Sequence, residues 1–321
     1  MRFDIVIIGG GIVGAGAARD AAMRGLSVAL LEQDDLASGT SSRSSKLVHG
    51  GLRYLEQGEF SLVFEAVSER RVLMDIAPHL VNPLGFLFPV YKASKVGPFA
   101  LNLGMWLYDG LSLFRSPKIH KNLSPRDVTE EEPGLLADGL RGAQLYYDCA
   151  TNDARLTLET ALDAVAHGAD VRTYTKVTGL LRDADGRVRG VRARDLHGQA
   201  EVEVEAQVVV NATGPWTDTI RNLGEARPKL LRPTKGVHVV VPRERLPLRH
   251  AVVCAHPSDK RVLFALPWGD RSYVGTTDTD YDGDPADVAA SGADVDYLLG
   301  CMGHYFPGAK LGRDDVLPGM I

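Results

Sequence analysis

The N-terminal segment is the part of this chain that most limits its fold. A short apolar run, Phe3–Ile8, leads into the six residues GGGIVG, Gly9–Gly14, and a helical segment follows as far as Arg24. A second apolar run, Ser27–Leu31, comes next. A buried strand, a glycine-rich turn, a helix and a second strand, in this order, are typical of a Rossmann βαβ unit. The sequence therefore predicts an α/β fold that begins with a Rossmann-like dinucleotide-binding domain.

Each glycine of the GxGxxG pattern is required for a different physical reason. Gly9 permits a tight turn, Gly11 lets the backbone approach a pyrophosphate, and Gly14 lets the helix pack close to the strand. The N–H groups at the start of the helix face the phosphates. Glu32 ends the second strand, where a carboxylate accepts hydrogen bonds from ribose hydroxyls, and its charge disfavours NADP. A surface glutamate after a strand is the alternative, which the complete βαβ context disfavours.

Two further features favour FAD over NAD as the dinucleotide. The tripeptide Ala212-Thr213-Gly214 follows an apolar strand far downstream and resembles the second nucleotide-proximal turn of two-dinucleotide-fold flavoproteins. The segment Ala37–Lys46 is rich in hydroxyl groups, among them those of Thr40, Ser41 and Ser42. Such donors suit an extended pyrophosphate and ribityl chain, although a solvated Ser-rich linker would have the same composition.

The rest of the chain is predicted to alternate between two domains. Helices are expected at Glu59–Ala77, which Pro78 ends, and at Asp153–Ala166, which Gly168 ends. Strands are expected at Val171–Tyr174, Val177–Arg182, Val188–Arg194, Glu201–Glu205, Val208–Asn211, Val237–Val241, Ala251–Cys254, Arg261–Leu266 and Ser272–Gly275. We therefore expect a discontinuous FAD-binding domain, residues 1–79 and 149–233. It is interleaved with an antiparallel, β-rich substrate or cap domain, residues 80–148 and 234–306.

One apolar stretch, Val96–Phe114, is long enough to be considered as a membrane span. Its only charged residue is Asp109, but glycines, Pro98 and Asn102 interrupt it. A buried or an interfacial helix is the better interpretation, and of the two the sequence favours a buried one.

Composition excludes several classes of function. The formal net charge is −5 and the isoelectric point is about 6.0, which argues against a general affinity for nucleic acid. The three cysteines, Cys149, Cys254 and Cys301, form no CxxC pair and no metal-ligand spacing, so no metal site is predicted. We interpret them as reduced structural cysteines. The N-terminus lacks the pattern of a signal peptide. Together these two features predict a cytoplasmic location.

The block Ser41–Glu56, SSRSSKLVHGGLRYLE, carries a specific resemblance. The chain resembles the FAD-dependent glycerol-3-phosphate dehydrogenases, respiratory enzymes that oxidise sn-glycerol 3-phosphate to dihydroxyacetone phosphate. Four shorter segments agree with this family: Asp153–Leu156, Asn211–Trp216, Lys235–His238 and Gly275–Asp278. The resemblance covers about Phe3 to about Val316, and HGGLRYLE is its most specific part.

The resemblance implies roles for residues at matching positions. His49 and His238 lie in blocks that reach the substrate end of the flavin, and Arg53 and Tyr54 face the substrate phosphate. The positions that it places near the FAD are Gly50, Gly51, Val177, Ala212, Thr213, Gly214 and Trp216, with Val177 contacting the adenine through its backbone. It also implies electron transfer to a quinone, which would place the protein peripherally on the inner face of the cytoplasmic membrane. The sequence leaves the oligomeric state open, with a homodimer as one option.

These residue types suit the chemistry. Oxidation of a secondary alcohol sends a hydride from carbon to flavin while a base takes the hydroxyl proton, and histidine suits that base. Arginine offers a phosphate a planar, permanently charged donor. Gly50 and Gly51 would let the backbone approach the flavin ring. Two alternatives stay open: His238 could simply pack in a strand, and Arg53 could pair with Glu56 on a helix face.

The family continues where this chain ends. After Asp314–Val316 it runs into a Gly-Leu-Arg-Pro-like segment, a last strand and helix, and a C-terminal helical domain, whereas this chain ends at Ile321. That segment supplies an arginine toward the substrate phosphate and a helix N-terminus toward the flavin. We therefore expect a fragment or the product of a truncated gene, with residues 307–321 as its truncated end. Two other functions stay open: an amine or amino-acid oxidase of the same fold, and a non-catalytic FAD-binding remnant.

Overall fold

The computed structural model describes residues 1–51, 54, 57–94, 96–112 and 116–318. The chain divides into two compact units, each made of two stretches of sequence. Unit 1 comprises residues 1–46 and 152–233, and unit 2 comprises residues 47–151 and 234–321.

Unit 1 is built on a six-stranded sheet with the order β7-β2-β1-β10-β9-β8. Its strands are β1 (Arg2–Ile8), β2 (Val28–Leu31), β7 (Asp170–Arg172), β8 (Thr175–Arg182), β9 (Val188–Asp195) and β10 (Glu201–Asn211). Its helices are α1 (Ile12–Met23), α6 (Asp153–Ala166) and α7 (Thr217–Arg221), with short 3-10 turns at Thr40–Ser42 and Gly214–Trp216. The first four strands of the sheet are parallel, and β8, β9 and β10 form an antiparallel meander. This is the Rossmann-like arrangement that the sequence predicts.

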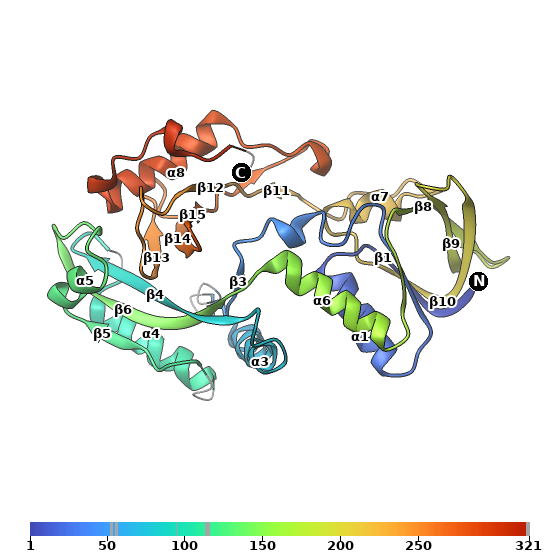
Figure 1. The fold of residues 1–321 in the computed structure, drawn as a ribbon, viewed down its shortest axis with the longest axis horizontal. Coiled ribbons are helices and arrows are strands. Elements are labelled where there is room, and N and C mark those ends of the chain that lie inside the picture. The colour runs from blue at the N-terminus through green and yellow to red at the C-terminus, as the bar shows by residue number, and fades with distance from the viewer. Residues whose placement is uncertain (52–53, 55–56, 95, 113–115, 319–321) are drawn as a thin grey trace. The chain divides into compact units, whose positions relative to one another are not determined.

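Apolar clusters cover both faces of this sheet. On one face, α1 and α6 lie side by side (Figure 1), and Ala18 of α1 and Ala164 of α6 pack with Ile7 and Leu30. On the other face, Val6 and Leu31 of the parallel strands cluster with residues of the meander, namely Val177, Val191, Ala193 and Val204. The central parallel strands therefore lie between two apolar layers, one on each face of the sheet.

Strand β10 corrects one predicted boundary. The sequence predicts two strands, Glu201–Glu205 and Val208–Asn211, but the structure has one continuous strand. Its first half pairs with β9 in antiparallel fashion, and its second half pairs with β1 in parallel fashion. The sequence pattern changes at this point because the neighbouring strand changes, not because the strand ends.

Unit 2 contains an eight-stranded sheet, in which seven strands follow the order β12-β15-β14-β13-β4-β6-β3 and β5 pairs with β6. Its strands are β3 (Leu47–Val48), β4 (Asn82–Tyr91), β5 (Lys121–Leu123), β6 (Leu140–Ala150), β12 (His238–Pro242), β13 (Ala251–Ala255), β14 (Val262–Trp268) and β15 (Arg271–Gly275). A separate pair joins β11 (Thr234–Lys235) to β16 (Thr279–Asp280). The helices are α3 (Phe60–Ile76), α4 (Pro98–Leu111), α5 (Pro125–Glu131) and α8 (Gly292–Tyr305). All pairs in the large sheet are antiparallel except β13 with β4.

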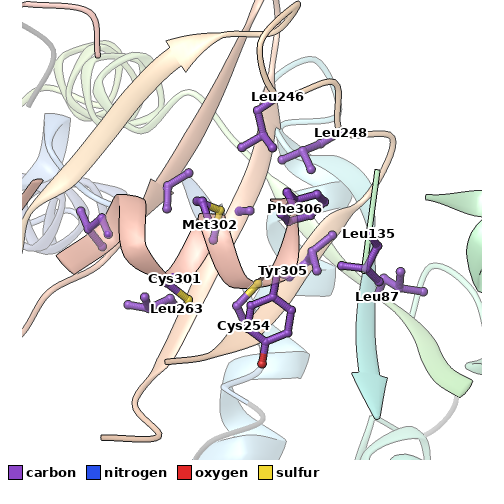
Figure 2. Close-up of a cluster of buried hydrophobic side chains, with 14 of the residues drawn as sticks. Leu87, Leu135, Leu246, Leu248, Cys254, Leu263, Cys301, Met302, Tyr305 and Phe306 are labelled. Carbon is purple, nitrogen blue, oxygen red and sulfur yellow. Dashed lines mark hydrogen bonds between the residues drawn. The ribbon is translucent and has the colours of Figure 1, made fainter. Parts of the chain in front are cut away.

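Helices also cover both faces of the unit 2 sheet. Figure 2 shows Cys301, Met302 and Tyr305 of α8 packed among Cys254 of β13 and Leu263 of β14. A second cluster joins residues of α3 and α4 to the sheet, namely Val63, Val67, Met105, Tyr108, Phe86 and Tyr146. All three cysteines are free and buried, as the sequence predicts.

Three predicted boundaries differ from this division, the smallest difference being residues 149–151, which belong to unit 2 because β6 continues to Ala150. The sequence pattern places residues 47–79 in the FAD-binding domain, but they belong to unit 2. The physical reason is that β3 pairs with β6 and that Val63 and Val67 of α3 pack on the unit 2 sheet. Residues 307–318 also belong to unit 2, since Val316 packs on its core and the Leu317 N–H donates to the Val240 carbonyl.

Helix α4 occupies part of the predicted apolar stretch Val96–Phe114. It packs on unit 2 through Leu101, Met105 and Tyr108. Four of its other apolar side chains face outward: Phe99 is 82% exposed, and Leu103, Trp106 and Leu107 are also exposed. The helix is therefore half-buried rather than fully buried. Within the described part of the chain, no helix is long and apolar enough to span a bilayer.

Candidate functional site

The glycine turn of unit 1 is a close contact between three backbone segments. Gly9 has a φ of +109°, and its N–H donates to the Leu31 carbonyl over 2.9 Å. A Cβ at Gly9 would lie 2.6 Å from the Ala212 carbonyl oxygen, and a Cβ at Gly14 would overlap the Gly9 oxygen. Only glycine fits at both positions, as the sequence predicts for a turn that packs a helix close to a strand.

The N-terminus of α1 is open to a ligand. Gly11 is its N-cap and makes no side-chain capping bond. The Ile12 N–H donates to the Ser41 hydroxyl over 2.9 Å, and a Cβ at Gly11 would lie 3.1 Å from that oxygen. The helix dipole and the N–H groups of the first turn favour an anion here. The absence of a side chain at Gly11 lets the Ser41 hydroxyl lie against the first turn of α1.

Glu32 is buried at the end of β2, and the protein backbone already uses both its oxygens. Its Oε2 accepts from the Gly10 N–H over 2.6 Å, and its Oε1 accepts from the Asp34 N–H over 2.8 Å. Each carboxylate oxygen has a second lone pair, so ribose hydroxyls could still donate to it. Glu32 therefore fixes the glycine turn in addition to the predicted role toward ribose.

The Ser-rich segment is an anchored loop rather than a solvated linker. Ser44 donates to the Asp153 Oδ2 through both its N–H and its hydroxyl, at 3.1 and 2.7 Å. The Lys46 ammonium lies 2.9 Å from the Asp153 Oδ1 and also donates to the Ser42 carbonyl. Asp153 is the first residue of α6, so this helix holds the loop that carries Thr40, Ser41 and Ser42.

The remaining predicted residues of unit 1 lie around the same strand ends. The Ala212 N–H donates to the Ile8 carbonyl, and the Thr213 hydroxyl donates to Asn211 over 2.7 Å. Trp216 packs against Gly39, where a Cβ would lie 3.2 Å from the indole ring. The Thr175 N–H donates to the Glu32 carbonyl over 2.7 Å, which places the start of β8, and with it Val177, beside β2. Unit 1 thus gathers its predicted residues at the carboxyl ends of parallel strands, where such folds bind dinucleotides.

In unit 2, His49 follows β3 and is exposed. Its Nδ1 accepts a hydrogen bond from the Gly51 N–H over 3.1 Å. A neutral imidazole with an acceptor at Nδ1 carries its proton on Nε2. In this geometry the outer nitrogen of His49 is therefore a hydrogen-bond donor, whereas a general base would need a lone pair there.

The packing of unit 2 explains Gly50 and Gly51 without reference to a ligand. A Cβ at Gly50 would overlap the Tyr108 hydroxyl and Val67. Gly51 has a φ of +67°, and a Cβ there would overlap the ring of Tyr54. The predicted approach to a flavin ring stays a prediction for both glycines, while their internal contacts already require the absence of a side chain.

His238 lies at the start of β12 and is 8% exposed. Its ring stacks on Tyr273, with centroids 4.5 Å apart and an interplanar angle of 15°. It faces Gly275 across the sheet, and a Cβ at that glycine would overlap the imidazole. The small residue opposite His238 therefore makes room for a flat ring between two strands.

The predicted phosphate-binding pair is described only in part. Arg53 lies outside the described residues. Tyr54 is 40% exposed, and its N–H donates to the Gly51 carbonyl over 2.8 Å. The backbone of Tyr54 is thus tied to the loop that carries His49.

Sequence reasoning missed a buried polar trio in unit 2, formed by Arg70, Tyr108 and Asp148. Arg70 and Asp148 form an ion pair, and the side chains of both are at most 3% exposed. Tyr108 donates to the Asp148 Oδ1 over 3.0 Å. Burial raises the pKa of Tyr108 well above its ordinary value, and Asp148 raises it further. Burial lowers the pKa of Arg70, but Asp148 and Tyr108 outweigh this and raise it overall.

The sequence signal for this trio is weak. Arg70 lies in a helix rich in charged residues, where an arginine normally faces water. The three residues come from α3, α4 and β6, and only the tertiary fold brings them together.

Comparisons with known proteins agree with the geometry. A family model described as FAD dependent oxidoreductase matches residues 4–319. A glycerol-3-phosphate dehydrogenase of Mycobacterium leprae is 51% identical over 93% of this chain and 51% of its own length. An alpha-glycerophosphate oxidase of Streptococcus pyogenes is 45% identical over 98% of this chain and 52% of its own length.

A solved structure shows the same fold. The glycerol-3-phosphate dehydrogenase of Bacillus halodurans, complexed with FAD, superposes with a TM-score of 0.81 at 38% identity. The match covers 98% of this chain and 55% of that one. The chain therefore spans about half the length of these two curated relatives and of this solved structure.

Proposed function

Because this chain belongs to the FAD-dependent oxidoreductase family, we propose that its protein uses FAD to oxidise sn-glycerol 3-phosphate to dihydroxyacetone phosphate. The observation that carries the proposal is the nucleotide site of unit 1, where the glycine turn, Glu32 and the Ser41 loop meet at the open end of α1. The names of the relatives supply the substrate. They favour a phosphate ester over the amine or amino acid of the alternative oxidase.

The residues of unit 1 suggest how FAD would be held. The N-terminus of α1, with Gly9, Gly11 and Gly14, suits the pyrophosphate, and Glu32 suits the ribose hydroxyls. The hydroxyls of Thr40, Ser41 and Ser42 offer donors along the chain of the cofactor. Val177 and the turn Ala212–Gly214 complete the set.

The residues of unit 2 supply the substrate chemistry. When bound, FAD accepts the hydride that leaves C2 of the substrate. Arg53 and Tyr54 bind the phosphate, which requires a permanent positive charge and a hydroxyl donor. His49 donates a hydrogen bond from Nε2, because its Nδ1 is held by the Gly51 N–H. His238 takes the proton of the C2 hydroxyl, which leaves His49 in an orienting role.

We also propose that the electrons pass to a quinone at a membrane surface, as in the respiratory family that the sequence resembles. The outward apolar face of α4, formed by Phe99, Leu103, Trp106 and Leu107, supports contact with the headgroup region of a bilayer. Co-sedimentation with anionic liposomes tests this contact. A protein that stays entirely in the supernatant would contradict it.

The central test is anaerobic addition of sn-glycerol 3-phosphate to the FAD-loaded protein, followed through the visible absorbance of the flavin. We expect bleaching with sn-glycerol 3-phosphate and none with glycerol, glycine or L-proline. Bound flavin that no phosphate ester bleaches would refute the proposed oxidation and favour a non-catalytic FAD-binding protein. Bleaching by an amino acid would instead favour the amino-acid oxidase.

A second step distinguishes the acceptor. The reduced protein is mixed with a soluble quinone or with air-saturated buffer, and the return of the flavin absorbance is timed. A quinone that reoxidises the flavin faster than oxygen agrees with the proposal. The reverse order would make the protein an oxidase.

A further inference from the structure

The buried trio of Arg70, Tyr108 and Asp148 converges on a single oxygen atom. The Asp148 Oδ1 accepts from the Arg70 guanidinium, from the Tyr108 hydroxyl and from the Gly50 N–H, the last over 3.1 Å. Arg70 is held in turn by the Ser116 hydroxyl over 2.9 Å and by the Tyr147 carbonyl over 3.3 Å. The oxygen that binds the Gly50 amide is therefore held in place by two further donors, Arg70 and Tyr108.

The Gly50 amide belongs to the loop that carries the candidate site. Gly50 is buried against Tyr108 and Val67, and its neighbours on either side are His49 and Gly51. The Gly51 N–H then donates to the His49 Nδ1. An anchor at the Gly50 amide fixes the peptide that joins His49 to Gly50, and with it the backbone from which the imidazole reaches the Gly51 N–H.

The two side chains that donate to Asp148, those of Arg70 and Tyr108, keep their protons in the neutral range. Arginine stays charged, and the raised pKa of Tyr108 keeps its hydroxyl protonated. Both groups therefore donate to Asp148 at every pH at which an enzyme of this kind works. A buried arginine–aspartate pair can often be replaced by apolar side chains without loss of stability. A contribution to stability therefore does not by itself explain why this pair is present.

We propose that Asp148, held by Arg70 and Tyr108, is a positioning residue that orients His49 through the Gly50 amide and fixes its proton on Nε2. The proposal rests on the proposed function, because it gives His49 an orienting role toward the substrate. Asp148 touches neither substrate nor cofactor in this account, and it acts only through the backbone of the loop.

The first test reads the imidazole directly and needs no substrate. Histidines are labelled with nitrogen-15 in the full chain, and the His49 signals are identified by their loss in His49→Gln. We expect the neutral His49 of the wild type to carry its proton on Nε2. In Asp148→Asn and Tyr108→Phe the Nδ1 tautomer should appear.

Asp109→Asn is the matched control. Asp109 is an equally buried aspartate of unit 2, paired with His120 over 2.7 Å, and the described structure gives it no bond to the His49 loop. Asp109→Asn should lower the free energy of unfolding as Asp148→Asn does, but it should leave the tautomer of His49 unchanged. Tyr108→Phe keeps the aromatic ring and removes one of the three donors, so it carries the test if Asp148→Asn does not fold.

The second test is the rate of flavin reduction by saturating sn-glycerol 3-phosphate, measured per bound FAD. We expect at least a tenfold fall in Asp148→Asn, a smaller fall in Tyr108→Phe and less than a twofold change in Asp109→Asn. A wild type that sn-glycerol 3-phosphate does not reduce would refute the proposed function but leave the first test intact. Folded variants of Asp148 and Tyr108 with an unchanged His49 tautomer would overturn the positioning role.

Discussion

At the scale of single residues, Glu32 shows how a ligand-binding side chain can also organise the protein. Its two oxygens bind the N–H groups of Gly10 and Asp34 in the structure itself. The carboxylate thus ties the glycine turn to the segment after β2. A nucleotide would find the turn already shaped, which lowers the cost of ordering it on binding.

Glu32→Gln tests this double role. A glutamine has a single oxygen, so one of the two backbone donors would face an NH2 group. Hydrogen bonds to charged groups contribute about 1.5–3 kcal/mol, so we expect FAD to bind tenfold or more weakly. The cofactor-free protein should also melt at a lower temperature, which thermal unfolding measures. If only FAD binding changes, the two backbone bonds do not form in solution.

Gly50→Ala tests whether internal packing requires Gly50. A Cβ there would overlap the Tyr108 hydroxyl and Val67, and overpacking of this kind costs about 1–3 kcal/mol. Gly104→Ala is the control, because its Cβ would meet open space inside α4. That change should stabilise the protein by about 0.8–1.0 kcal/mol through helix propensity. Denaturant unfolding without FAD measures both, and an unchanged free energy of unfolding in Gly50→Ala would contradict the packing argument.

The residues that could be predicted from sequence are those whose spacing follows from local geometry. Gly9, Gly14 and Glu32 lie at set positions in a strand, turn and helix, so their places could be derived. The contacts of Gly50 could not, because Tyr108 and Asp148 reach it only through the folding of α4 and β6. The sequence indicated that Gly50 matters but not which neighbours exclude a side chain.

At the scale of elements, local signals located α1, α3 and α6, whereas α5, α7 and α8 were not predicted. The predicted helix Asp153–Ala166 has the bounds of α6, because the Asn152 side chain caps it and Gly168 follows with a φ of +97°. Strands β4 and β6 were not predicted. Pro83 and Pro89 interrupt the β pattern of β4, but β13 pairs only with Phe86 and Leu87. Pro83 and Pro89 lie outside the two residues of β4 that pair with β13, so their missing N–H groups are not needed for that pairing.

Helix α8 gives a prediction about pH. Burial would raise the pKa of Asp294, but hydrogen bonds from Lys235 and Ser291 outweigh it, so this pKa lies below its ordinary value of 3.8. An aspartate with a lowered pKa contributes stability above its unfolded-state pKa and loses it as the pH falls through the folded-state pKa. Asp294→Asn should therefore lower the free energy of unfolding at pH 7, by about 1.5–3 kcal/mol.

The same variant should approach the wild type in acid. Near pH 3.8 the carboxyl begins to take up a proton in the unfolded chain, and as the pH falls further, through the lower folded-state pKa, the wild type loses its advantage and the difference in free energy of unfolding should shrink. Urea unfolding between pH 3 and pH 7 measures this difference. A gap that stays constant over the whole range would show that Lys235 and Ser291 do not depress the pKa of Asp294.

At the scale of the whole molecule, the chain passes between the two units three times, after Lys46, Thr151 and Pro233. The sequence indicated this interleaving, since Rossmann-like and β-rich patterns alternate along it. It misassigned residues 47–79, because the periodicity of α3 shows that a helix has an apolar side and not which sheet that side covers. Long-range partners such as β3 and β6 have no local signature.

The division into units also predicts where a nucleotide acts. All the residues proposed for the adenine, ribose and pyrophosphate lie in unit 1, so ADP should be enough to stabilise that unit. Binding at one hundred times the dissociation constant adds about 2.7 kcal/mol to the free energy of unfolding. The tryptophans separate the units, because Trp216 belongs to unit 1 whereas Trp106 and Trp268 belong to unit 2.

A protein with Trp106→Phe and Trp268→Phe keeps Trp216 as its only tryptophan, and its fluorescence follows the melting of unit 1. We expect ADP to raise that melting temperature by several degrees, and Glu32→Gln in the same background to remove most of the shift. The reciprocal protein, with Trp216→Phe, reports whether unit 2 gains the same stability. An equal shift would mean that the units unfold together. No shift in the Trp216 signal would place nucleotide binding outside the glycine turn, and the assignment of FAD to unit 1 would then be wrong.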